Sequence, residues 1–159
     1  MLKIDIIAVG KMSHPFLSDG CTEYLKRIAP YYQLSVIEVA EEKQRGEGGA
    51  EVARILKHEG ERLLRLIGKR KGLTVALAVE GARISSEQFA AFLDDVSDHA
   101  SQISFLIGGS YGLSDDVKQR ADRLISLSDM TFPHQIARML LTEQLYRAAT
   151  INNGIKSHK

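Results

Sequence analysis

Five short apolar runs recur along the chain, and each is followed by a stretch in which apolar residues return every three or four positions. The runs cover residues 2–9, 34–39, 73–79, 103–107 and 124–127. The runs 73–79 and 103–107 lack polar alternation, which is typical of strands covered on both faces, whereas 34–39 alternates in part. The pattern therefore predicts an α/β fold with a largely parallel sheet and helices on both faces.

Capping residues mark the starts of several predicted helices. Ser85 with Gln88 three positions later is a capping-box pattern, in which each side chain bonds a free backbone N–H of the first turn. Ser114 or Asp115 could cap a short helix. The last predicted helix covers residues 134–151.

This last helix is apolar almost all round, because Ile136, Met139, Leu140, Leu141 and Leu145 do not form one narrow stripe. A helix of this kind is buried on two sides. Burial against a second subunit explains the excess, so we expect a homodimer. Deep packing inside its own domain is the alternative.

Composition limits the class of protein. With 159 residues, 44% of them apolar, the chain fits one globular domain spanning 1–159. A single cysteine, Cys21, excludes a disulfide framework. No apolar run approaches the roughly 18 residues of a membrane span, and the opening segment is too short and too acidic for a signal peptide. We therefore expect a cytoplasmic protein without a membrane partner.

Charge is unevenly distributed although the net charge is only +1. Residues 43–71 hold nine Lys or Arg against four acids, and residues 130–159 hold four against one. Two basic regions suit a polyanion such as RNA, whereas an ordinary solvated surface is the alternative. Residues 41–49 are charged and glycine-rich, which is the composition of a mobile loop.

The GGSYG segment at 108–112 directly follows a predicted strand. Glycines there allow either a ligand to approach the backbone or a tight turn, and the segment alone does not decide between them. It matches neither the dinucleotide fingerprint nor the phosphate loop. The histidines show no metal-binding spacing, so we predict no metal site.

Four motifs occur in an order and spacing that resemble one known family. They are IDIIAVGK (4–11), LIGGSYGL (106–113), MTFPHQIAR (130–138) and TEQLYRA (142–148). Together they resemble the RlmH family of ribosomal RNA methyltransferases, which belongs to the SPOUT superfamily. The resemblance implies a fold with a C-terminal trefoil knot, and a homodimer. It also implies transfer of a methyl group from S-adenosyl-L-methionine to ring N3 of a pseudouridine in large-subunit ribosomal RNA, within assembled ribosomes.

The resemblance also implies where the cofactor binds. The positions that correspond to the family's pocket are Leu77, Gly108 and the run Leu127, Ser128, Asp129, Met130, Thr131 and Phe132, with Gly109 permitting close contact.

The imide nitrogen is protonated at neutral pH, so the reaction needs a base or a group that stabilises the anion. The candidate catalytic residues are His134, Arg138, His158 and Lys159. The family's tail carries a tyrosine before the histidine, and this chain has Ser157 there, so stacking on the base is not expected from that position.

Two other functions fit the same residues. One is a SPOUT methyltransferase of a different RNA, such as transfer RNA. The other is a non-catalytic protein that binds ribosomes or assists their assembly, which would keep the basic regions but would not need a cofactor pocket.

Overall fold

The structure is a computed structural model that describes residues 1–155. Strands and helices alternate along the chain. They are β1 (Lys3–Val9), α1 (Pro15–Ile28), β2 (Gln33–Val39), α2 (Gly49–Ile67), β3 (Leu73–Arg83), α3 (Ser86–His99), β4 (Gln102–Ile107), α4 (Asp115–Arg120), β5 (Arg123–Ser126) and α5 (His134–Asn152). The predicted strands and helices are all present. The capping box at Ser85 and Gln88 is confirmed, and Ser114 rather than Asp115 caps α4.

The five strands form one sheet in the order β2-β1-β4-β3-β5. All four neighbouring pairs are parallel. The predicted α/β class with a parallel sheet is therefore confirmed.

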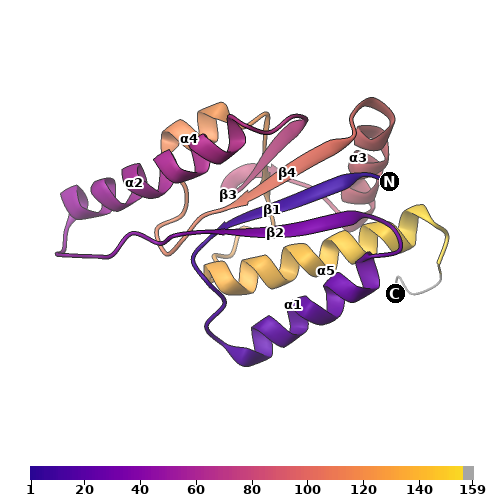
Figure 1. The fold of residues 1–159 in the computed structure, drawn as a ribbon, viewed down its shortest axis with the longest axis horizontal. Helices are drawn as coiled ribbons and strands as arrows, with labels where there is room; N and C mark the ends of the chain where they lie inside the picture. The colour runs from indigo at the N-terminus through magenta and orange to yellow at the C-terminus, as the bar shows by residue number, and fades with distance from the viewer. Residues whose placement is uncertain (156–159) are drawn as a thin grey trace.

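Helices cover both faces of this sheet, as Figure 1 shows. Alternate residues of β1 point to opposite faces, so Ile4 and Ile6 join one buried cluster and Ile7 joins the other. The first cluster packs against α1, α3 and α5, and the second against α2 and α4. This double burial explains why β1 and β4 lack regular polar alternation, unlike the edge strand β2.

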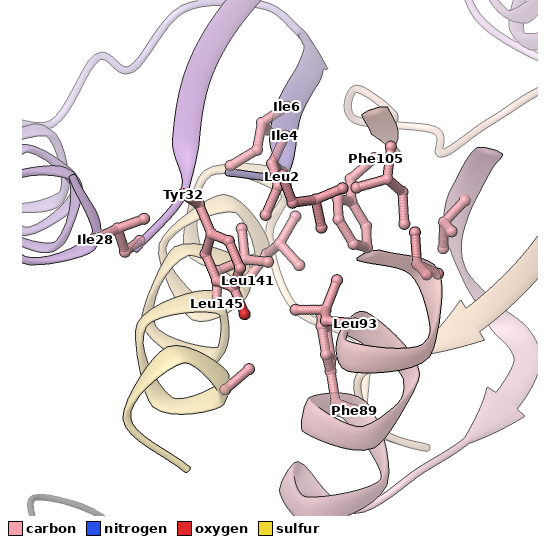
Figure 2. Close-up of a cluster of buried hydrophobic side chains, with 14 of the residues drawn as sticks. Leu2, Ile4, Ile6, Ile28, Tyr32, Phe89, Leu93, Phe105, Leu141 and Leu145 are labelled. Carbon is pink, nitrogen blue, oxygen red and sulfur yellow. The ribbon is translucent and has the colours of Figure 1, made fainter. Parts of the chain in front are cut away.

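Helix α5 lies between α1 and α3 on the first face. Leu141 and Leu145 are fully buried and meet Phe89 and Leu93 of α3 (Figure 2). No residue from 134 to 151 is fully exposed. Packing inside its own domain, the alternative that the sequence left open, therefore accounts for much of the apolar surface of α5.

Strand β3 is longer than predicted because it contains a bulge. Leu77 and Ala82 both pair with Ile125 of β5, so residues 78–81 are looped out of the sheet. The apolar run ends at Val79, and nothing in its pattern indicates that pairing resumes after the bulge. Ala78, Val79 and Glu80 of this bulge line the cleft described below.

The segment 41–49, predicted to be a mobile loop, is fastened to α2 by ion pairs. The Glu42 carboxylate binds both Arg54 and Arg62, and Glu51 accepts from the backbone N–H groups of Arg45 and Gly46. Hydrogen bonds from Arg54 and from the backbone lower the pKa of Glu51 to about 2. The segment 41–49 has the composition of a loop, but these contacts with residues of α2 hold it in place.

Arg70 takes part in the fold at the amino edge of the sheet, where β1 and β3 begin. Its guanidinium Nε lies 3.0 Å from a carboxylate oxygen of Asp5, which is 1% exposed. Gln102 also donates to this carboxylate. Arg70 therefore compensates a buried charge.

Replacing Arg70 by alanine should lower the free energy of unfolding by about 3 kcal/mol, because it leaves a buried carboxylate without its cation. Urea denaturation measures the change. Lys69→Ala, at an exposed neighbouring position, is the control and should change stability by less than about 0.5 kcal/mol. Equal effects of the two substitutions would contradict this role of Arg70.

Candidate active site

The direction in which the chain winds across the sheet reverses between β1 and β4. From β1 the chain moves outward to β2, whereas β4, β3 and β5 lie on the other side. In open parallel sheets, ligands bind beyond the carboxyl ends of the strands at such a point. Gly10 follows β1 and Gly108 follows β4 at this edge. The fold therefore places the predicted glycine-rich segment where a ligand is expected.

The segment 108–112 folds back on itself. Gly109 and Gly112 form an antiparallel bridge, and the Gly112 N–H donates to the Gly109 carbonyl at 3.0 Å. A Cβ on Gly108 would overlap the Gly112 backbone, and Gly112 has a φ of +81°. The segment is thus a tight turn that also lines a cleft, so the two interpretations left open by the sequence are compatible.

A cleft of about 970 Å³ opens beside this turn. Its walls come from the carboxyl ends of β3, β4 and β5 and from the start of α5. Among the residues predicted to bind the cofactor, those that line it are Leu77, Gly108, Gly109, Leu127, Ser128, Met130, Thr131 and Phe132. Asp129 does not; it is exposed and forms an ion pair with Arg83. The structure brings the other predicted residues together, and their role stays a prediction.

Hydrogen bonds shape the segment that follows β5. The Ser126 hydroxyl donates to the Ser128 carbonyl at 3.0 Å, and the Ser128 hydroxyl accepts from the Met130 N–H at 3.0 Å. On the opposite wall, Lys118 of α4 contacts Glu80 of the β3 bulge at 2.5 Å. This hydrogen bond lowers the pKa of the Glu80 carboxyl. Both walls are therefore held by local polar contacts.

The predicted catalytic residues differ in their placement. His134 is the first residue of α5 and lines the cleft. Arg138, one turn later, is 4% exposed and does not line it. Its guanidinium donates to the Glu38 carboxylate at 2.8 Å and to the Gly10 carbonyl at 2.9 Å. His158 and Lys159 lie outside the described residues, so their roles also stay predictions.

A second cavity of about 400 Å³ adjoins the cleft, and Ser110 and Tyr111 line both. Glu59, 3% exposed, lines this cavity. One of its carboxyl oxygens accepts from the Glu42 N–H, and the other has no hydrogen-bond partner among the described residues. Burial raises the pKa of the Glu59 carboxyl, and the nearby Glu41 carboxylate acts in the same direction.

Sequence reasoning missed several charged residues at this edge, namely Glu41, Glu59, Glu80 and Lys118. Glu41 follows the predicted strand 34–39 by two residues, and this position was a usable signal. The others could not be assigned, because a glutamate or lysine on an amphipathic helix is usually solvated, and the β3 bulge was not predicted.

Among residues 1–155 no group of three or more His, Cys, Asp or Glu side chains could hold a metal ion. Within the same part of the chain, no helix is long and apolar enough to cross a membrane.

Comparison with known proteins assigns the chain to a family. The family model described as "Predicted SPOUT methyltransferase" matches residues 2–158. A probable methyltransferase from Bordetella pertussis Tohama I has a similar structure, with a TM-score of 0.57 and 16% identity; the match covers 93% of this chain and 96% of that one. The chain belongs to the SPOUT methyltransferase family.

Close relatives carry a more specific name. A protein of Streptococcus uberis named "Ribosomal RNA large subunit methyltransferase H" is 44% identical over 160 residues, covering 99% of this chain and all of the relative. A protein of Exiguobacterium sibiricum with the same name is 46% identical over the same shares. The resemblance seen in the sequence motifs is thus confirmed over the full length.

Proposed function

We propose that this protein transfers a methyl group from S-adenosyl-L-methionine to large-subunit ribosomal RNA, at ring N3 of a pseudouridine. The observation that carries the proposal is the cleft at the carboxyl edge, in a chain whose full-length relatives are named for this RNA. The basic residues at this edge also suit RNA. Action on assembled ribosomes places the protein in the cytoplasm.

The residues of the cleft fit S-adenosyl-L-methionine. The volume of the cleft is adequate for this molecule, which is an adenosine joined to an amino acid. Leu77 and Phe132 supply apolar walls for the adenine ring, and Gly108 and Gly109 let a ligand reach the backbone. When bound, this cofactor supplies an electrophilic methyl group on a sulfonium. The protein's contribution is to hold a ring nitrogen in line with that methyl group.

We also propose the C-terminal knot that the resemblance implies. The chain leaves the edge strand β5 through residues 127–133 and returns to the middle of the first face, where α5 packs between α1 and α3. A return of this kind is compatible with threading through a loop. A knot is otherwise rare, and only the family resemblance suggests it here.

A homodimer is part of the same proposal. Phe16, Val79, Tyr111 and Met130 are exposed apolar side chains, and all of them line the cleft. An exposed apolar cluster of this kind is typical of an interaction surface. A second copy would cover it and exclude water from the reacting atoms.

The length of α5 bears on where the predicted catalytic residues His158 and Lys159 can act. Helix α5 has 19 residues and so spans about 28 Å, from His134 at the cleft to Asn152, three residues before Ile155. The three residues from Ile155 to His158 can extend about 11 Å at most. We therefore propose that His158 and Lys159 act at the cleft of the partner subunit.

Incubation of the protein with ribosomes, isolated large subunits, naked ribosomal RNA and transfer RNA, each with S-adenosyl-L-methionine labelled in the methyl group, tests the proposed function. We expect label in large-subunit RNA of assembled ribosomes, at a pseudouridine identified by mass mapping. Label in transfer RNA would support the other RNA methyltransferase. Ribosome binding without label, and without cofactor binding in calorimetry, would support the non-catalytic binding protein.

The structure separates the basic region 43–71 into two parts. Lys43 and Arg45 are exposed at the carboxyl edge, next to the second cavity, whereas Lys69 and Lys71 lie at the amino edge. The sequence alone predicts that the whole basic region 43–71 contacts RNA. We now assign contact with the RNA to the first pair.

Reversing both charges, Lys43→Glu with Arg45→Glu, should weaken ribosome binding at least tenfold. It should also lower the slope of log Kd against log salt by about one or more, because fewer counterions are released. Filter binding at several salt concentrations measures both. The matched control is Lys69→Glu with Lys71→Glu, and an equal loss in this control would contradict the assignment.

Deletion of residues 157–159 should reduce single-turnover methyl transfer about a hundredfold or more, as for a lost acid–base group, with unchanged cofactor affinity. Mixed dimers test action on the partner's cleft. A chain with the deletion and a chain with His134→Ala should each be inactive alone, whereas their mixture should recover activity. Failure to recover, or a fully active deletion variant, would contradict the proposed role of the tail.

A further inference from the structure

Two titratable side chains converge on Gly10, the residue that follows β1 at the point where the winding reverses. A Cβ built on Gly10 would lie 3.5 Å from Glu41 Oε2 and 3.7 Å from His134 Nε2. The two atoms are therefore at most about 7.2 Å apart, the sum of these distances. Both atoms therefore face the space beside Gly10, where one planar group can hydrogen-bond to both.

Both side chains are available for a ligand. Among residues 1–155, neither Glu41 nor His134 has a hydrogen bond or ion pair, and the Glu41 residue is exposed. Their charged neighbours are already engaged, since Arg138 binds Glu38 and Gly10, and Glu42 binds two arginines. Among the described residues around Gly10, Glu41 and His134 are therefore the carboxylate and the imidazole that remain unpaired.

The place is also the boundary between the two hollows. His134 lines the cleft assigned to the cofactor, and Glu41 lines the second cavity. Ser110 and Tyr111 line both. A base that enters through the second cavity would meet the cofactor's methyl group between Glu41 and His134.

We propose that Glu41 is a catalytic residue that removes the ring N–H proton of the target base, an imide-bearing pyrimidine; this rests on the proposed function. The proton passes to a Glu41 carboxylate oxygen, and the nitrogen electron pair forms the new bond to the methyl carbon. The sulfur–methyl bond breaks with its electron pair left on sulfur, which becomes a neutral thioether. Glu41 then releases the proton to water.

His134 suits the complementary role. It is the first residue of α5 and lines the cleft. Its imidazole can donate an N–H to a carbonyl oxygen of the base, on which negative charge develops. Glu59 is less suited to remove the proton, because it is buried and its Oε2 already accepts from the Glu42 N–H.

Glu41→Gln keeps the shape and hydrogen bonding of the side chain but cannot take a proton. We expect single-turnover methyl transfer to ribosomes to fall about a hundredfold, within the usual range for a lost general base. Calorimetry with S-adenosyl-L-methionine and filter binding of ribosomes should give dissociation constants within threefold of the unmodified protein. Glu47→Gln is the matched control, an exposed glutamate of the same segment, and should leave the rate unchanged.

A fall of at least tenfold with both binding constants retained supports the proposal. A smaller fall, or a fall matched by weaker binding of cofactor or ribosome, overturns it. The proposed function fails separately, if the unmodified protein does not label ribosomal RNA at all.

Discussion

The carboxyl edge of the sheet depends on one buried guanidinium. Arg138 extends from the first turn of α5 to the Gly10 carbonyl and the Glu38 carboxylate, so it joins the last helix to β1 and β2. A buried cation is stable only where it is paired and hydrogen-bonded. These two partners therefore fix the start of α5 over the end of β1, and with it the position of His134. The catalytic role that the sequence predicts for Arg138 stays a prediction, and its hydrogen bonds position the start of α5.

Charged side chains at the carboxyl edge of the sheet differ in their exposure and in their partners. Lys43 and Arg45 are exposed toward solvent, whereas Glu42 neutralises Arg54 and Arg62 behind them. The exposed residues of this segment thus include Lys43, Arg45 and Glu47, whereas Glu42 and the buried Glu59 line the second cavity.

Much of the fold could be predicted from the sequence, because strands covered on both faces and capped helices leave local signals. The run 103–107 and the Ser85 capping box are examples. The β3 bulge and the partners of Arg70 and Arg138 could not be predicted, since they depend on contacts between residues far apart in the chain. The cofactor residues came from family resemblance, and their gathering around one cleft is what the structure adds. Glu41 became a catalytic candidate only through the structure, in which its carboxylate lies close to Gly10.

The central claim is that the cleft at the carboxyl edge binds S-adenosyl-L-methionine. Titration of the isotope-labelled protein with this cofactor, followed by amide NMR, tests it most directly. The account predicts saturable shifts of the Gly108, Gly109 and 127–132 amides, with little change at the opposite edge near Leu2 and Asn153, where a third hollow lies. Shifts confined to that opposite hollow, or no shifts at millimolar cofactor, would contradict it.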